Sequence, residues 1–222
     1  MSNPVKIRSV TKITHDVLQV VTDKPPAHVF NPGQATDVSI NKKGWEKEIR
    51  PFTFTSLPAD DHIEFTIKTY PSRNGVTNRL LQLAAGDELI LGDVFGDISY
   101  KGEGLFIAGG AGVTPFLAIL RYLRSENLVG NNKLIFANKT KADIIHEKEL
   151  HELLGDHFIN VLSDEQAGGY EHGFITETIL KKHISGNEQY FYLCGPPPMM
   201  DAVQKQLAAL HINPEHIVTE SF

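Results

Sequence analysis

The pattern of apolar residues changes character about one hundred residues into the chain. Before that point, short runs of β-forming residues are separated by turn signals such as Asn31-Pro32-Gly33 and Gly86-Asp87. Strands at this spacing are typical of a small antiparallel β-barrel. We expect one short helix at Arg79–Leu83, capped by Asn78. The expected strands are Lys6–Ile13, Val17–Thr22, Thr36–Ile40, Phe52–Ser56, His62–Thr69 and Glu88–Leu91.

After that point, apolar runs alternate with helical patterns, which indicates a parallel sheet with crossover helices. The expected strands are Leu105–Ala108, Leu134–Ala137, Phe158–Leu162, Tyr190–Leu193 and Ile217–Thr219. Helices are expected near Pro115–Arg124, Lys148–Leu154, Thr176–His183 and Met199–Leu210. The stretch Tyr100–Gly104 is the best boundary, so we predict a β-barrel domain over 1–101 and an α/β domain over 102–222.

Composition excludes several classes of protein. A net charge of −6 argues against nucleic-acid binding, which needs an excess of Lys and Arg. The single cysteine, Cys194, allows neither an internal disulfide nor an iron–sulfur cluster built from this sequence. No apolar run resembles a signal peptide or reaches the roughly 20 residues of a membrane span. We therefore expect a cytoplasmic protein without a membrane span.

A glycine-rich turn, Gly109-Gly110-Ala111-Gly112-Val113-Thr114-Pro115, follows the first strand of the second half and opens a helix. Glycines let a backbone approach a diphosphate, whose charge then meets the amide groups of the helix start. Pro115 suits the first helical turn. The third glycine of the G-x-G-x-x-G fingerprint is replaced by Pro115, so a turn without a ligand remains an alternative at this stage.

Two further segments carry candidate chemistry. Cys194-Gly195-Pro196-Pro197-Pro198-Met199 ends another strand, so it is expected at the same sheet edge as the glycine-rich turn. Arg50-Pro51-Phe52-Thr53 offers a cation for phosphate, an aromatic face and a hydroxyl on one strand. Taken alone, each has a structural alternative: an inert buried cysteine and an ordinary β-strand.

Together, in this order, these motifs resemble the ferredoxin–NADP reductase-like flavoproteins over essentially the whole chain. That family's R-x-[YF]-[ST] motif stands as Arg50-Pro51-Phe52-Thr53, its G-x-G-x-T-P element begins at Gly110, and its C-G-x-P-x-M element begins at Cys194. Its G-x-x-[ST] element is approximated by Gly75-Val76-Thr77-Asn78, where Asn78 departs from the pattern. The resemblance implies a flavin-binding β-barrel followed by an NAD(P)-binding α/β domain.

For the barrel, the resemblance implies that Arg50 holds the flavin phosphate and that Phe52 lies against the flavin ring. Thr53 would hydrogen-bond the flavin N5 region. The backbone of Gly75-Val76-Thr77-Asn78 would bind the diphosphate, and Thr77 would replace the missing hydroxyl of position 78. Pro51, Ile67 and Lys68 complete the expected flavin contacts.

For the second domain, the resemblance implies that the dinucleotide contacts Gly110, Ala111, Gly112, Val113, Thr114, Asn138, Cys194, Gly195, Pro196 and Met199. Thr53, Cys194 and Glu220 are the expected catalytic residues: Cys194 would aim the nicotinamide, and Glu220 would relay a proton or order the site. The last residue, Phe222, either stacks on the flavin or is a frayed terminus.

The implied cofactor is FAD, with FMN less favoured, and the implied substrate is NADH or NADPH. Asp164 and Glu165 would repel a 2′-phosphate and favour NADH, whereas Lys139 and Ser163 favour NADPH. With one cysteine, the chain is expected to pass electrons to a separate acceptor: ferredoxin, flavodoxin, a cytochrome or an oxygenase component. The alternatives are a reductase of free flavin and a non-catalytic flavin-binding module.

A metal site is not expected. The segment His146-Glu147-Lys148-Glu149-Leu150-His151 superficially resembles a zinc H-E-x-x-H motif. Its histidines are five residues apart rather than four, so they miss one helix face. A solvated amphipathic helix is the better interpretation.

Overall fold

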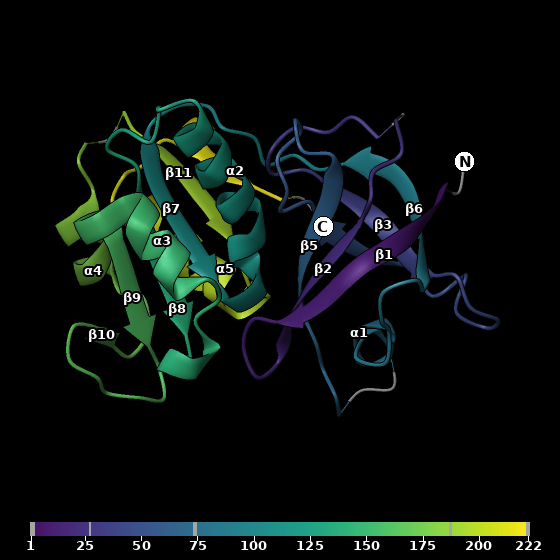
Figure 1. Cartoon of the computed structure of the whole chain (residues 1–222). Helices are drawn as coiled ribbons and strands as arrows, with labels where there is room; N and C mark the ends of the chain where they lie inside the picture. Colours follow the sequence, from purple (N-terminus) through teal and green to yellow (C-terminus); the bar gives the residue numbers. More distant parts are fainter. Residues whose placement is uncertain (1–2, 27, 73–74, 187, 221–222) are drawn as a thin grey trace. The chain divides into compact units, whose positions relative to one another are not determined.

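The computed structural model describes residues 3–26, 28–72, 75–186 and 188–220 (Figure 1). The chain divides into two compact units, Met1–Gly96 and Asp97–Phe222. The division falls slightly before the stretch in which the sequence placed the boundary. One physical reason is that Tyr192 holds the backbone of Lys101 and Gly102 through its hydroxyl, within the second unit.

The first unit is a six-stranded antiparallel sheet in the order β4-β3-β6-β1-β2-β5. An isolated bridge between Phe54 and Phe65 pairs the chain after β4 with β5, so the two edge strands meet and the sheet closes into the expected barrel. Phe54, Phe65 and Val38 lie in its apolar core. The strands are β1 Asn3–Lys12, β2 Val17–Asp23, β3 Ala35–Ile40, β4 Arg50–Thr53, β5 His62–Lys68 and β6 Glu88–Phe95.

The short helix of this unit is α1, Val76–Leu80, rather than the expected Arg79–Leu83, so that prediction was wrong. Val76 and Leu80 are four residues apart and both buried, which anchors one helix face on the barrel core. Asn78 therefore lies inside the helix and does not cap it; Gly75, in extended conformation, precedes the first turn.

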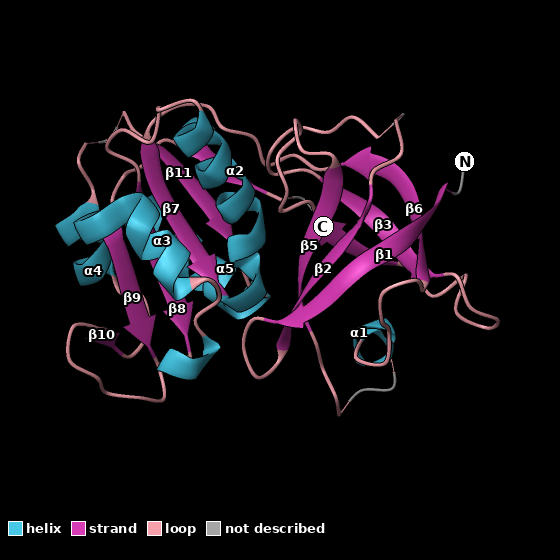
Figure 2. Ribbon diagram, in the orientation of Figure 1, coloured by secondary structure: helices cyan, strands magenta, loops and turns pink. Residues whose placement is uncertain are grey.

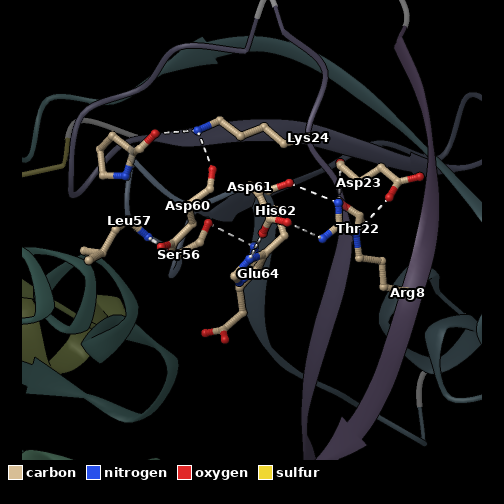
Figure 3. A network of polar contacts seen from close by, with 11 residues as sticks. Arg8, Thr22, Asp23, Lys24, Ser56, Leu57, Asp60, Asp61, His62 and Glu64 are labelled. Carbon is tan, nitrogen blue, oxygen red and sulfur yellow. Dashed lines mark hydrogen bonds and ion pairs between the residues drawn. The ribbon is translucent and has the colours of Figure 1, made fainter.

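Polar contacts fasten the connection between β4 and β5 to the barrel (Figure 3). Arg8 of β1 donates to Asp23 at 2.8 Å and to the carbonyl of Asp61 at 3.0 Å. Lys24 donates to the carbonyls of Pro58 and Asp60. This network thus ties the connection to the end of β2 and to β1.

The second unit is a six-stranded parallel sheet in the order β10-β9-β8-β7-β11-β12. Helices cover both faces (Figure 2), which explains why its strands read as continuous apolar runs. The strands are β7 Gly104–Gly109, β8 Lys133–Asn138, β9 Phe158–Leu162, β10 Glu171–His172, β11 Tyr190–Cys194 and β12 Ile217–Thr219. The helices are α2 Thr114–Ser125, α3 Glu147–Leu154, α4 Glu177–His183 and α5 Pro197–Ala209.

Side-chain alternation along β7 assigns the two faces. Leu105 and Ile107 pack in one core with residues of α4 and α5. Phe106, on the opposite face, meets Phe116 of α2 edge-on, with ring centroids 5.2 Å apart. Within the described residues, no helix has both the length and the apolar character required to cross a membrane.

Candidate cofactor-binding sites

The strand order of the second unit creates a switch point between β7 and β11. The chain leaves β7 for β8, β9 and β10 on one side, then returns to β11 on the other side. Open α/β sheets bind ligands at the carboxyl ends of the strands at such a point. The two turns located there are Gly109–Gly112, after β7, and Cys194–Gly195, at the end of β11.

These two turns are in backbone contact. A Cβ atom on Gly112 would overlap with the carbonyl oxygen of Cys194. A Cβ atom on Gly195 would lie 3.0 Å from the nitrogen of Gly109 and 2.6 Å from a methyl carbon of Met199. The glycines are therefore required by packing, and the sequence prediction that both turns share one sheet edge is confirmed.

The outer side of the glycine-rich turn is open. Gly110 has a φ of +52°, and a Cβ atom there would meet no other atom within 4 Å. Ala111–Val113 form one 3₁₀ turn with Gly110, and α2 begins at Thr114 with Pro115 in its first turn. No side chain caps the start of α2; the Thr114 hydroxyl donates to the carbonyl of Ala111 instead. The Thr114 amide already donates to the carbonyl of Ala111 and Pro115 has no amide hydrogen, so the amide groups left for another acceptor are those at the start of the 3₁₀ turn, which no side chain caps.

Cys194 and Glu220 lie at the ends of neighbouring strands, because β11 pairs in parallel with β12 up to Leu193 and Thr219. Burial, with a smaller contribution from the negative charge of Glu220, raises the pKa of the Cys194 thiol to about 12. A thiol with a pKa this high is protonated at neutral pH, which is typical of a packing group rather than of a nucleophile. One Glu220 carboxylate oxygen accepts a hydrogen bond from the backbone of Asp97 at 3.2 Å.

Two acidic side chains are fixed beyond the carboxyl end of β9. Asp164 accepts a 2.6 Å hydrogen bond from the hydroxyl of Ser163. Glu165 accepts a 2.7 Å hydrogen bond from the backbone of Lys141, which follows β8. The ammonium group of Lys141 lies over the ring of Tyr170, 5.3 Å from its centroid. The carboxyl end of β9, on the far side of β8 from the switch point, thus presents two carboxylates held by hydrogen bonds.

In the barrel, β4 carries the motif Arg50-Pro51-Phe52-Thr53. The guanidinium of Arg50 is exposed and donates one hydrogen bond to the carbonyl of Ile49. Phe52 is half-buried and packs against the barrel core, 6.4 Å from the ring of Phe65. Pro51 is exposed and Thr53 half-buried, so this strand offers a cation, a ring and a hydroxyl at the surface.

The remaining barrel candidates differ in what they expose. Ile67 and Val76 are buried in the barrel core, which leaves only their backbones to contact a ligand. Lys68 forms a 2.9 Å ion pair with Asp16. Gly75 precedes α1, and no side chain caps the start of this helix. Gly75, Thr77 and Asn78 are half-buried.

Comparison with known proteins decides the family. Residues 2–92 match the family described as FAD-binding domain, and residues 106–205 match the family described as oxidoreductase NAD-binding domain. The chain is a ferredoxin–NADP reductase-like flavoprotein. Its FAD-binding and NAD-binding domains correspond to the two units of the structure.

Individual relatives agree with this assignment. The reductase component of propane 2-monooxygenase from Mycolicibacterium goodii is 31% identical, over 98% of this chain and 66% of that protein. The CS–b5R domains of human Ncb5or, in an NAD⁺ form, are 26% identical with a TM-score of 0.86, over 100% of this chain and 70% of that chain. A flavohem-like FAD/NAD-binding domain of nitric oxide dioxygenase from Vibrio cholerae O1 biovar El Tor has a TM-score of 0.87 at 23% identity, covering 99% and 98%.

The chain spans 59 to 66% of the length of three oxygenase-system components that it matches. The residues present nevertheless fit both cofactors of a ferredoxin–NADP reductase-like protein. For the dinucleotide, the open glycine turn, whose 3₁₀ start no side chain caps, suits a diphosphate. Asn138, at the end of β8, has a buried amide without a partner among the described residues. For FAD, the exposed Arg50 and the half-buried Phe52 offer phosphate and ring contacts.

The remaining predicted site residues lie near the turn at Cys194, at the C-terminus and in the segment with two histidines. Pro196 is exposed and Met199 half-buried beside Gly109, so both flank the turn at Cys194. Phe222 lies outside the described residues. In the segment with two histidines, His146 lies before α3 and forms an ion pair with Glu149 at 3.3 Å, whereas His151 is in the last turn of the helix.

Several contacts within the second unit were not predicted. Lys141 and Tyr170 flank the acidic loop, and Tyr192 fixes Gly102 through its hydroxyl. Each of these contacts joins residues far apart in sequence, so no local pattern signals them. Only Gly109 had a signal in the sequence, because it belongs to the glycine-rich turn. Its lack of a side chain is required, since a Cβ atom there would collide with Met199.

Proposed function

We propose that this chain is an NAD(P)H-dependent FAD oxidoreductase that delivers electrons to a separate acceptor. The observation that carries the proposal is the pair of contacting turns, Gly109–Gly112 and Cys194–Gly195, at the switch point of an NAD-binding domain. The FAD-binding domain supplies the second half of the reaction. Relatives named as reductase components of oxygenase systems support the same role.

In the FAD-binding domain, the exposed guanidinium of Arg50 would bind a phosphate bidentately. Phe52 would support the flavin ring, and the Thr53 hydroxyl would bond the ring edge at which reduction occurs. Backbone amides of Gly75, Val76, Thr77 and Asn78 would add to the phosphate contacts. Bound FAD supplies the capacity to take a hydride and to release electrons singly.

In the NAD-binding domain, the residues from Gly110 to Thr114 would hold the diphosphate by backbone amides and the start of α2. The neutral thiol of Cys194 would pack beside the nicotinamide and restrict its orientation, because positioning is most of what hydride transfer requires. Glu220 would keep a negative charge near that position and hold the backbone of Asp97.

Electrostatics favour NADH over NADPH. Asp164 and Glu165 are held by hydrogen bonds at the edge where the adenosine ribose is expected, and a 2′-phosphate beside two carboxylates would be repelled. Lys141 could offset part of this repulsion, but its ammonium group lies over Tyr170. We therefore infer that NADH is the preferred substrate.

The acceptor is proposed to be a ferredoxin or an oxygenase component, in line with the relatives' names, in the cytoplasm. The 222 residues hold one cysteine, so they cannot by themselves ligate an iron–sulfur cluster as an onward carrier. An acceptor outside these residues is needed to complete a turnover.

The test is spectroscopic. Purified protein, reconstituted with FAD, is expected to show bound-flavin absorbance that bleaches on anaerobic addition of NADH, and to reduce ferricyanide catalytically. Flavin that binds but does not bleach would make the chain a non-catalytic module. Activity that requires excess free flavin and leaves no flavin bound would make it a free-flavin reductase. Either result would overturn the proposal.

A further inference from the structure

Two buried asparagines lie on one face of the parallel sheet without full hydrogen bonding. Asn138 ends β8 and Asn160 lies in the middle of β9, each only 8% exposed. Neither the amide nitrogen nor the amide oxygen of Asn138 has a partner among the described residues. For Asn160, the oxygen has none. Because buried polar groups are nearly always paired, each such amide requires an explanation.

The positions of the two amides differ. In the β8–β9 register, Asn138 is level with Leu162, the last residue of β9, whereas Asn160 is level with Phe136, two residues deeper in the sheet. The strand β8 also contacts the glycine-rich turn of Gly110–Val113, and Ala137, beside Asn138, is level with Gly109 in the β7–β8 register. Asn138 therefore belongs to the ligand-binding edge of the sheet, and Asn160 belongs to its interior.

The chemistry of the free amide limits its ligand. Asn138 offers an acceptor oxygen and a nitrogen with two donors. A diphosphate only accepts hydrogen bonds, so it would leave the oxygen of Asn138 unpaired. A ribose hydroxyl both donates and accepts, so it can satisfy both halves of the amide.

We propose that Asn138 binds a ribose hydroxyl of the nicotinamide dinucleotide. The inference rests on the proposed function, because it takes the dinucleotide as the ligand of this edge. Both amide atoms are covered in the structure. The side chain must therefore turn toward the ligand when it binds, a rotamer change that is common at binding sites. The unpaired amide of Asn138 thus serves binding rather than stability. Replacing it with an apolar group is expected to leave the ligand-free protein at least as stable.

Asn138→Leu tests this directly, with Asn160→Leu as a matched control. Leucine has a similar shape and no polar atoms, so both variants are expected to melt at or above the temperature of the parent protein. Calorimetry with NAD⁺ is expected to show affinity weakened at least about tenfold for Asn138→Leu and unchanged for Asn160→Leu. Asn138→Ser keeps a donor and an acceptor, and is expected to recover part of the loss.

Two simpler ligands identify the ribose. Weaker binding of ADP to Asn138→Leu would assign the contact to the adenosine ribose. A loss seen with NAD⁺ and nicotinamide mononucleotide but not with ADP would assign it to the nicotinamide ribose.

The contrary outcomes are distinct. If Asn138→Leu binds NAD⁺ as well as the parent protein does, or if Asn160→Leu loses as much affinity, the inference is wrong. Lower thermal stability of Asn138→Leu with unchanged affinity would assign the amide a structural role and also overturn it. If the parent protein itself binds neither NAD⁺ nor NADH, the proposed function fails first.

Discussion

The backbone of Gly112 lies against the carbonyl group of Cys194, so closely that a methyl group on Gly112 would overlap with that oxygen and lie 2.7 Å from the nitrogen of Gly195. Gly112 and Cys194 are far apart in sequence. Their turns fit together only because neither Gly112 nor Gly195 has a side chain. Backbone atoms cannot rotate away as a flexible side chain would. The contact fixes the distance between the two turns that we assign to the dinucleotide.

Gly112→Ala should therefore be destabilising. The added methyl group must displace one of the two turns, at a cost of about 1–3 kcal/mol, and NADH binding should weaken as the turns separate. Thermal unfolding and NADH titration would measure both effects. Gly168→Ala is the control, because a Cβ atom there meets nothing within 4 Å and φ is not in the left-handed region. Equal stability of the two variants would contradict the contact.

Local periodicity allowed most elements to be predicted, because amphipathic strands and helices carry their own signal. The sheet edge shared by Gly110 and Cys194 also followed from sequence, since parallel strands align their carboxyl ends. The two-residue strand β10, Glu171–His172, was missed because it has no apolar alternation. The helix α1 was misplaced because an asparagine cap was weighted above the buried pair Val76 and Leu80.

Side-chain pairing between distant elements could not be predicted. The unpaired amide of Asn138 can be recognised only once the turn after β7 lies against β8. Likewise, nothing near Tyr192 in sequence indicates that its hydroxyl reaches Gly102. Such contacts depend on three-dimensional packing and have no sequence period.

Tyr192→Phe should loosen the segment that begins the second unit. The buried hydroxyl accepts from the backbone nitrogens of Lys101 and Gly102, at 2.8 and 3.1 Å, and donates to the carbonyl of Gly102 at 2.7 Å. Its removal leaves these groups without a partner and should cost about 2 kcal/mol. The ring stacking on Phe106 is kept, so the loss reports on the hydroxyl alone.

The measurement is chemical denaturation, together with hydrogen exchange of the Lys101 and Gly102 amides, which should accelerate in Tyr192→Phe. Tyr190→Phe is a control on the same strand, expected to change stability by less than about 0.5 kcal/mol. Unchanged exchange at both amides in Tyr192→Phe would rule out the proposed anchoring.

The ion pair between Arg121 of α2 and Glu149 of α3 should stabilise the NAD-binding domain. It is bidentate, at 2.6 and 2.9 Å, and both side chains are largely shielded from solvent. Arg121→Met would leave Glu149 shielded without its main partner, at a cost of about 2 kcal/mol or more. Lys148→Met, which removes a 92% exposed partner of Glu152, should cost almost nothing. Urea denaturation of both variants makes the comparison.

The same pair predicts a pH dependence. Burial opposes ionisation of Glu149, but its hydrogen bonds with Arg121 prevail and the pKa of the carboxyl is lowered in the folded state. Its contribution is therefore complete above the pKa of an unfolded glutamate, about 4.3, and is lost as pH falls through the lower folded value. Arg121→Met should lose less stability than the parent protein on acidification over that interval. Identical acid-unfolding curves would contradict this.

Substitution of Asp164 should change the choice of nucleotide. Its carboxylate, fixed by Ser163, is expected beside the adenosine ribose, where a 2′-phosphate would add charge of the same sign. Asp164→Arg replaces repulsion with attraction and should shift the kcat/KM ratio toward NADPH by about tenfold or more. Glu171→Arg makes the same charge change on β10, where Lys182 pairs with it, and should leave the ratio nearly unchanged. Equal shifts in both variants would show only a general charge effect.

Cys194 should be unreactive toward alkylating agents in the folded protein. Burial raises its pKa to about 12, so at pH 8 the thiolate fraction is on the order of a thousandfold below that of a free cysteine. Iodoacetamide labelling followed by mass spectrometry should therefore be very slow, and fast after unfolding. Since the charge of Glu220 also raises this pKa, Glu220→Gln should label faster than the parent protein does, though still slowly. Rapid labelling of the folded parent would show a thiolate at Cys194 and remove the argument that this residue acts by packing and orientation.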